Sequence, residues 1–433
     1  MEMLLHYCWK HKLFLADSLI TTDGQIVDII DTGLHNNDAG PDFFNAKVKV
    51  GGTLWVGNVE IHNRSSDWYK HGHDSDAAYN NVVLHVVEFS DADVTTSSGR
   101  VVPQVRISVP QYVSRQYEEL LMADKYPPCH KIVPRLSQLM LHGWLNTLQT
   151  ERLEQKTQAI LARLEQSGGS WEAAYFVTLA RNFGFGVNGD AFETWARHIP
   201  LTQAAHHRDN LFQIEAMFFG QAGLLDEAAI PIHSRNDAAQ DIYLSRLKNE
   251  YAYLSHKFSL QPMDAGAWRF MRLRPQNFPY IRLSQIAMLY YEHRTELSRL
   301  LDCRTSEEIR EMLKTRVTPY WENHYTFGRA SGKSAKTLSQ ASLNLVIINT
   351  AIPVLFAYGR YGQDESFCER AFHMLEEMKV EDNGITRMWR DCGIDASHAG
   401  DSQALIQLKK EYCDRKYCLR CRIGYEYLKE PGK

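Results

Sequence analysis

The chain has 433 residues, of which 44% are apolar and 23% are charged, and its net charge is −4. This composition is typical of a soluble protein of two or three domains, and it excludes a protein that binds nucleic acid through bulk positive charge. No unbroken apolar run approaches the ~20 residues that cross a bilayer, and the charged N-terminus differs from a signal peptide, so we expect a cytoplasmic protein with no membrane partner.

The first 113 residues alternate between helix and strand patterns. Asp23-Gly24 and Gly51-Gly52 each lie between β-prone segments, which is typical of hairpin turns. The segment Val82–Phe89 is almost wholly apolar, which predicts a strand buried on both faces. In chain order, we expect a helix at 4–13, a hairpin at 19–30, strands at 42–50 and 53–62, a short helix at 66–81 broken near Gly72, and strands at 82–89 and 101–109.

After about residue 111 the alternation of strands ends and helical spacing dominates, most plainly in Leu136–Leu164 and Ser339–Leu355. The pair Pro127-Pro128 after Tyr126 is unfavourable for helix, so we place the linker there. The sequence therefore predicts an α+β protein, with a sheet domain at 1–125 and a larger all-α domain at 126–433.

Two acidic residues fall at corresponding ends of neighbouring strands. Asp42 begins one strand, while Glu60 and His62 lie near the end of the next and share a face because they are two residues apart. By strand alternation Asp42 would share its face with apolar residues such as Ala46 and Val48, where a carboxylate is costly unless it is paired or binds metal. Oxygen ligands of this kind favour Mg²⁺ or Mn²⁺; the alternative is a pair of rim residues neutralised by Arg64 or a lysine.

Pro41-Asp42 and Glu60-Ile61-His62, in the order helix, three strands, helix, strand, resemble the core of the PD-(D/E)XK nucleases, the restriction-endonuclease-like superfamily. The resemblance implies metal-dependent hydrolysis of a phosphodiester in nucleic acid, with Asp42 and Glu60 as metal ligands. The whole chain also resembles an uncharacterised family of bacterial conserved hypothetical proteins, a domain of unknown function, and that resemblance implies no activity.

The sequence departs from the nuclease pattern at His62, which stands where the superfamily has lysine. An imidazole with a pKa near ~6.5 can orient water or protonate a leaving group, and Lys70, Lys47 or Lys49 could supply the missing charge. The departure and the acidic net charge also fit a degenerate module that binds nucleic acid or a protein without turnover.

His71 and His73 follow the second strand closely, and with His62 and Asp76 they could form a transition-metal site for zinc, manganese or iron in a metalloenzyme that is not a nuclease. On its own, the His-x-His spacing of His71 and His73 is not specific for a metal site. His85, inside an apolar strand, is more simply a core histidine with its hydrogen bonds satisfied.

Three cysteines near the C-terminus, Cys413, Cys418 and Cys421, have the spacing of a thiolate site for zinc or an iron–sulfur cluster. Such a site needs a fourth ligand, for which Cys392 or His398 lie upstream. The alternative is that the three thiols pack as small apolar side chains.

Basic residues interleaved with aromatic ones occur in the helical half. Arg272, Arg274 and Arg282 could contact phosphates there, as could Lys333 in a Gly/Ser/Lys-rich loop. The alternative is a packed aromatic core surrounded by solvated arginines, with a plain surface loop around Lys333.

Overall fold

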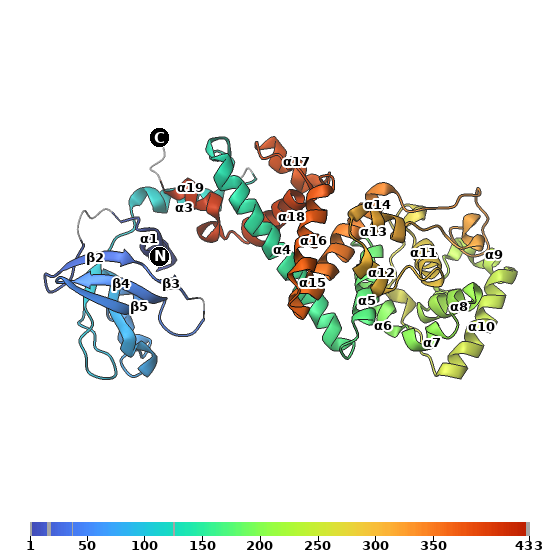
Figure 1. Cartoon of the computed structure of the whole chain (residues 1–433), viewed down its shortest axis with the longest axis horizontal. Helices are drawn as coiled ribbons and strands as arrows, with labels where there is room; N and C mark the ends of the chain where they lie inside the picture. Colours follow the sequence, from blue (N-terminus) through green and yellow to red (C-terminus); the bar gives the residue numbers. More distant parts are fainter. Residues whose placement is uncertain (1, 15–18, 37, 124–125, 430–433) are drawn as a thin grey trace. The chain divides into compact units, whose positions relative to one another are not determined.

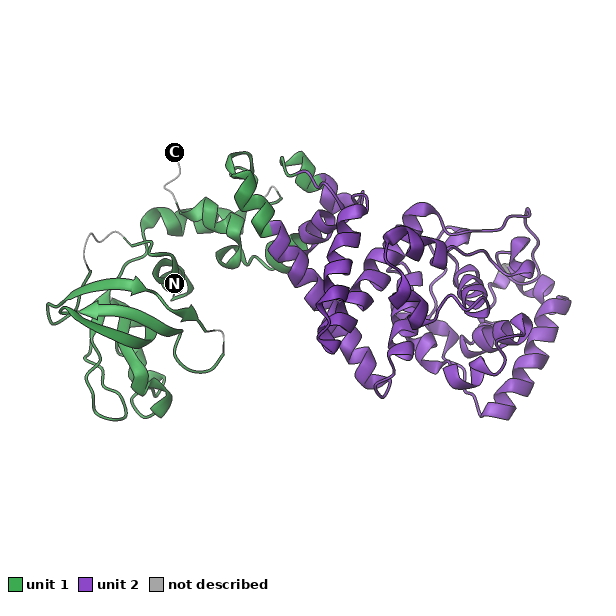
Figure 2. Ribbon diagram, in the orientation of Figure 1, with its two compact units in different colours: residues 1–144, 388–394, 408–433 green, residues 145–387, 395–407 purple. Residues whose placement is uncertain are grey.

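A computed structural model describes residues 2–14, 19–36, 38–123 and 126–429 (Figure 1). The chain forms two compact units, shown separately in Figure 2: unit 1 contains residues 1–144, 388–394 and 408–433, and unit 2 contains residues 145–387 and 395–407. The expected division fell after residue 125. Unit 1 extends beyond it and includes the end of the chain, because the last helix packs against the sheet-bearing unit, where Tyr425 contacts the ring of His11.

Unit 1 is built on one mixed sheet in the strand order β1-β2-β4-β5-β6-β7, with β3 paired to β4. The first strands pair antiparallel, β6 runs parallel to β5, and β7 runs parallel to β6. The protein is therefore a mixed α+β chain with an N-terminal sheet and a larger helical region. The strands are β1 Leu19–Ile20, β2 Ile26–Asp31, β3 Leu34–His35, β4 Phe43–Val50, β5 Thr53–Arg64, β6 Val82–Phe89 and β7 Gln104–Arg106.

Helices of unit 1 flank this sheet and carry the chain end, while α4 and α17 each continue from one unit into the other. The helical segments before α5 are α1 Glu2–His11, α2 Asp67–Lys70, η1 Ala77–Asn81, α3 Gln111–Met122, η2 Val133–Arg135 and α4 Gln138–Gln166. Those that follow unit 2 or cross back into unit 1 are α17 Gly384–Asp391, η9 Leu408–Cys413, η10 Cys418–Arg420 and α19 Arg422–Leu428.

The β4–β5 hairpin forms as predicted, because Gly51 and Gly52 both adopt positive φ, as a two-residue turn of this type requires. One expectation on β4 is wrong. A bulge at Asn45, whose φ is 56°, shifts the register, so that Ala46 and Val48 join Phe43 in the core instead of sharing a face with Asp42. Asp42 is thereby left on the opposite side from these apolar residues.

The two faces of the sheet are covered by different elements. On one face, Leu5 and Trp9 of α1 pack in the core with strand residues such as Ile61 and Leu84. The other face is covered by the segment between β5 and β6, where Trp68 and Tyr79 form a smaller cluster. This double cover explains why β6 is buried along its first six residues, as its apolar sequence predicts.

Two segments are shorter than the sequence predicts. Residues 66–81 form only the one-turn α2 and the 3₁₀ turn η1, interrupted near Gly72 at φ 75°. The final strand is limited to Gln104–Arg106. Pro103 and Pro110 lie on either side of it, and neither has a backbone N–H that could donate to a neighbouring strand.

Unit 2 is all-helical, with helices packed around one apolar core. Its helical segments are the remainder of α4, α5 Trp171–Phe183, α6 Gly189–His198, α7 Leu201–Ala205, α8 Leu211–Gln221, η3 Glu227–Ala229, η4 Ile232–Ser234, α9 Arg235–Ala239, α10 Ile242–Phe258, η5 Ala265–Ala267, η6 Pro275–Asn277, α11 Pro279–Tyr291, α12 Leu297–Asp302, α13 Ser306–Leu313, η7 Pro319–Glu322, α14 Gln340–Val346, η8 Ile347–Ala351, α15 Ile352–Gly362, α16 Glu365–Glu377 and α18 Ala399–Gln407.

The stretch Gln340–Gly362, through α14, η8 and α15, has the length and mean hydropathy (1.7) to cross a membrane, but two-thirds of it is buried within the protein. Pro353 lies within this stretch and cannot donate a backbone hydrogen bond to Asn349. The Asn182 side-chain amide donates to that Asn349 carbonyl instead, at 3.0 Å. The apolar stretch is thus a core helix of unit 2.

A buried carboxyl lies inside unit 2. Burial raises the pKa of Glu215 to about 7, although the hydroxyl groups of Thr318 and Tyr243 donate to its oxygens and oppose the shift. Between pH 4.5 and 7 the folded protein therefore binds this proton more tightly than the unfolded chain does, so that stability falls as pH rises through this window and levels off above it.

We predict that Glu215→Gln, which removes the titration but keeps a hydrogen-bonding oxygen, flattens this pH dependence. As pH rises from 5 to 8, the free energy of unfolding of the variant should increase relative to that of the wild type by up to a few kcal/mol. Thermal unfolding followed across this pH range measures the difference, with the exposed Glu165→Gln as control. Parallel wild-type and Glu215→Gln curves would contradict the assignment.

Candidate metal centre

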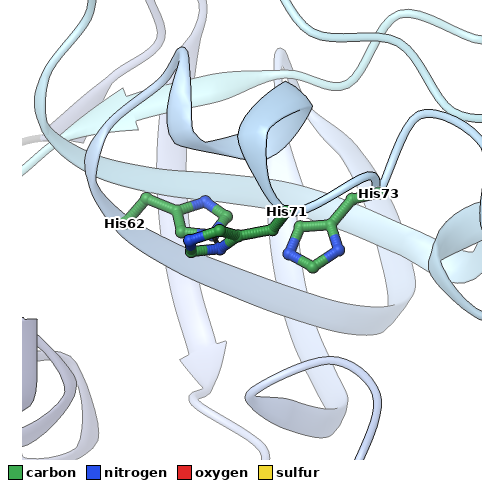
Figure 3. A group of neighbouring side chains, drawn as sticks. All are labelled: His62, His71 and His73. Atoms are coloured by element: carbon green, nitrogen blue, oxygen red, sulfur yellow. Dashed lines mark hydrogen bonds between the residues drawn. The ribbon is translucent and has the colours of Figure 1, made fainter.

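Three imidazoles meet on the face of the sheet that α2 and η1 cover. His62 lies near the end of β5, and His71 and His73 follow α2. Each offers a ligand atom, and these atoms all lie within 4.8 Å of one another. His62 Nε2 is 3.0 Å from His71 Nδ1, and the rings of His62 and His73 stack with centroids 5.3 Å apart. Figure 3 shows the three rings side by side.

The turn that carries His71 and His73 is fixed at both ends. At its start, the Asp91 carboxylate accepts from the backbone N–H of Ser66 at 2.9 Å and from the Ser65 hydroxyl at 3.1 Å. At its end, the His73 N–H donates to the Trp68 carbonyl at 3.0 Å. The Trp68 indole in turn donates to Thr95 O at 3.0 Å, so the two histidines are held on an anchored turn.

The two acids that the sequence singles out lie at the same end of β4 and β5. The Asp42 N–H donates to Glu60 Oε2 at 3.1 Å, and Asp42 Oδ2 accepts from the Ile61 N–H at 2.8 Å. Glu60 also faces two of the histidines, with Oε1 3.2 Å from His73 Nε2 and 3.6 Å from His62 Nε2. Glu60 and His62 therefore share a face, and both acids lie beside the histidines.

These spacings fit one ion. Metal–nitrogen bonds of ~2.1 Å in a tetrahedral site place neighbouring ligand atoms about 3.4 Å apart. The distance from His62 Nε2 to His71 Nδ1 is 3.0 Å, and the ligand atoms of all three histidines lie within 4.8 Å of one another. Nitrogen donors in this number favour a transition metal such as zinc, manganese or iron over magnesium.

A second row of hydrogen bonds orients His62. Its Nδ1 lies 2.9 Å from His85 Nε2, and His85 is the strand partner of Gln104 in the pairing of β6 with β7. If His85 carries its proton on Nδ1, the His62 Nδ1–H donates to His85 and the lone pair of His62 Nε2 faces the proposed ion. Such outer hydrogen bonds set the tautomer of metal-binding histidines.

Burial shifts the pKa values of the cluster in opposite directions. It lowers the pKa of His62 to about 2, helped by the neighbouring imidazoles, and that of His85 to about 3. It raises the pKa of Glu60 to about 9, with Asp42 adding to the shift, and that of Asp42 to about 6. Burial therefore favours the neutral forms of His62 and His85, as metal binding requires of His62, and disfavours the charged forms of both carboxyls.

His6, which the sequence did not single out, joins this site from α1. Its Nε2 lies 3.5 Å from Asp42 Oδ2. His6 and Asp42 line a cavity of about 540 Å³ together with residues from α1, the β3–β4 region and the C-terminal loop, including Lys10, His35 and Arg420. The amphipathic pattern of α1 identifies its buried residues. It does not indicate that a histidine at the edge of the buried face lies near Asp42.

Two other residues expected at the site have different partners. Lys70 forms an ion pair with Asp67 at 2.6 Å and remains largely exposed, so it does not replace the missing lysine. Asp76 accepts from the Ala78 N–H at 2.8 Å and caps η1. Lys47 and Lys49 are exposed on β4, opposite Val56 and Leu54. Short-range pairing and capping thus account for the side chains of Lys70 and Asp76.

The candidate nucleic-acid contacts lie in unit 2. Arg282 is buried, where it stacks over Phe185 and donates to Gln285 and Asn277, so the expectation that it meets phosphate is wrong. Arg272 and Arg274 are exposed, and Lys333 is exposed and pairs with Glu322 at 3.5 Å.

The C-terminal thiols lie together in unit 1, with a partner that the sequence did not identify. Cys413, Cys418 and Cys421 line one small cavity, and the fourth cysteine there is Cys129. Cys392, the expected partner, is not among the described residues that line it. The other expected partner, His398, is used locally, since its Nδ1 accepts from the Asp401 N–H at 3.3 Å. The sequence did not identify Cys129, because it is far from the other three cysteines along the chain and motif spacing relates only residues that are close in sequence.

We predict that His62→Ala abolishes stoichiometric binding of Co²⁺ or Zn²⁺ to this site, because it removes the ligand that contacts both His71 and Glu60. His85→Leu should retain binding with an affinity lower by about 10- to 100-fold, through loss of the outer hydrogen bond. Cobalt titration followed by visible absorbance measures both.

The exposed His373→Asn serves as control for this titration. Equal cobalt spectra in His62→Ala and wild type would contradict the metal-site assignment. An unchanged affinity in His85→Leu would contradict only the role of the second row of hydrogen bonds.

Comparison with known proteins gives one match. No curated protein and no solved structure matches this chain. The family described as "protein of unknown function (DUF2851)" matches residues 2–384, which is most of the chain and includes the sheet, the three histidines and both acids. The chain therefore belongs to the DUF2851 family.

Proposed function

We propose that unit 1 is a metal-dependent phosphodiesterase that acts on nucleic acid, with its ion held by His62, His71 and His73. The observation that carries the proposal is the convergence of these three imidazoles beside Glu60 and Asp42. Three histidine ligands leave coordination positions open for water and substrate. The exposure of His71 leaves the cluster accessible from solvent.

The bound ion would lower the pKa of a water molecule and stabilise negative charge on the phosphate. Glu60 is placed to accept the proton of that water, because its Oε1 lies against His73 and His62. Asp42 is held by the Ile61 N–H and lies 3.5 Å from His6, whose imidazole can donate a proton toward the cavity. These roles would replace those of the lysine that the nuclease pattern has and this chain lacks at His62.

The basic residues that line the cavity beside Asp42 favour the binding of an anionic substrate. Lys10 and Arg420 contribute positive charge to its walls, and His6 and His35 contribute imidazoles. Asp38 and Asp42 are its acidic residues, and Asp42 lies at the metal centre, where an ion would offset its charge. A phosphate group bound between the two basic side chains would thus lie next to the ion.

The arrangement of the sheet also supports the nuclease reading. An antiparallel set of strands ending in β5, a crossover, and the parallel strand β6 follow the helix α1. The resemblance to the PD-(D/E)XK superfamily implies helix, three strands, helix, strand; here five strands precede the crossover, which carries only the one-turn α2 and η1, and the two acids lie at the same strand ends. The ion expected from the resemblance was magnesium; the nitrogen ligands favour a transition metal instead.

The test is hydrolysis of labelled single- and double-stranded DNA and RNA after removal of metal by a chelator and addition of Mn²⁺, Co²⁺, Zn²⁺ or Mg²⁺. We expect cleavage restored by a transition metal, lost by at least 100-fold in His62→Ala and His73→Ala, and unchanged in Lys70→Ala. Nucleic-acid binding without cleavage in the metal-loaded protein would instead support a degenerate binding module.

We predict that Arg420→Ala weakens substrate binding, with KM raised about 10-fold and metal affinity unchanged, because the residue lines the cavity and is not one of the histidines proposed to hold the ion. Lys429→Ala, a change at another basic residue of the same C-terminal segment, is the control. A loss of metal together with activity in Arg420→Ala would show that its effect is structural and not on the substrate.

A further inference from the structure

We propose that Cys129, Cys413, Cys418 and Cys421 together bind one metal centre through four thiolates. This site is separate from the histidine cluster and does not depend on the reaction proposed for it. The inference goes beyond the spacing of the three C-terminal cysteines, because its fourth ligand comes from a segment 284 residues earlier in the chain.

The geometry begins with a cavity that the four cysteines share. It is lined by all four and by Pro128, Tyr412 and Gly424. None of the eight cysteines of the chain forms a disulfide. Buried thiols that serve only as apolar filling pack against other side chains; here four of them surround unfilled space.

The loop between the C-terminal cysteines is shaped to bring them together. Backbone hydrogen bonds from Lys416 N to Cys413 O (3.0 Å) and from Cys421 N to Cys418 O (3.2 Å) close two tight turns. Gly424 completes the loop, because a Cβ at this position would lie 2.0 Å from the Cys418 carbonyl oxygen. The lack of a side chain at Gly424 therefore allows its backbone to lie close to the backbone of Cys418.

Hydrogen-bond donors surround the sulfur of Cys421. Burial is the larger effect and raises the pKa of the Cys421 thiol to about 11, although the backbone N–H groups of Gly424 and Ile423 and the Trp144 indole act to lower that pKa. Donors directed at a sulfur are typical of thiolate ligands in metal and iron–sulfur sites.

The spacing of the thiols favours an iron–sulfur cluster over a single zinc ion. Around one zinc, bonds of ~2.3 Å place the sulfurs about 3.8 Å apart. Among the residues that the structure describes, the three imidazoles have ligand atoms within 4.8 Å of one another, and no three thiols do. A cluster binds each thiolate through a different iron and so holds the sulfurs farther apart.

The centre would fix one wall of the cavity at the histidine site. Leu419 and Arg420 lie between Cys418 and Cys421, and both line the cavity that contains His6 and Asp42. The thiolate centre would thus hold Arg420 in place next to the proposed substrate site, without contacting the substrate itself.

The experiment is anaerobic purification of the full chain, with absorbance near 400 nm and analysis of iron, acid-labile sulfide and zinc. We expect iron and sulfide in stoichiometric amounts and the absorbance of a cluster. Stoichiometric zinc at these thiols would keep the four-thiolate site and overturn the assignment to iron–sulfur. Protein that holds neither metal and has four reactive thiols would overturn the site.

Variants test the ligand set. Cys129→Ser and Cys418→Ser should each lose the centre, whereas Cys392→Ser and Cys368→Ser should keep it. Cobalt binding by the histidine cluster reports whether the sheet of unit 1 is still folded in each variant. Retention of the metal in Cys129→Ser, or its loss in Cys392→Ser, would show that the fourth ligand has been assigned wrongly.

Discussion

The parallel pairing of β5 with β6 is the constraint on which the histidine centre depends. It sets His62 beside His85, and the crossover between the two strands must return over the same face, bringing His71 and His73 with it. The apolar cover of Trp68 and Tyr79 then excludes water from most of the cluster. Burial of two carboxyl groups is costly unless a cation or hydrogen bonds offset their charge, which is why we propose a metal ion at this site.

Much of the sheet could be predicted from the sequence, because local signals determine it. The Gly51-Gly52 turn defines the β4–β5 hairpin, and the continuous apolar run of β6 indicates a strand covered on both faces. The shared face of Glu60 and His62 follows from strand alternation alone. The orientation of Asp42 could not be predicted in this way, because the bulge at Asn45 breaks the alternation and no glycine marks the bulge in the sequence.

What the sequence could not provide were contacts between distant segments. His6 reaches Asp42 from a helix whose pattern describes only its buried side, and Cys129 meets cysteines that are nearly 300 residues away. Arg282 was misjudged for the opposite reason: its basic, aromatic surroundings resemble a nucleic-acid surface, but the aromatics belong to a core that buries it. Composition does not reveal which face of such a segment is inside.

The two proposed centres would divide the work of unit 1, with chemistry at the histidines and positioning at the thiols. The most direct test of the central claim is anomalous scattering from crystals grown with Mn²⁺ or Zn²⁺. Apart from any peak at the four cysteines, the account predicts one peak among the three rings, about 2.0–2.2 Å from nitrogen atoms of His62, His71 and His73. A fully loaded crystal with no peak among these rings, or with the rings turned away from one another, would contradict it.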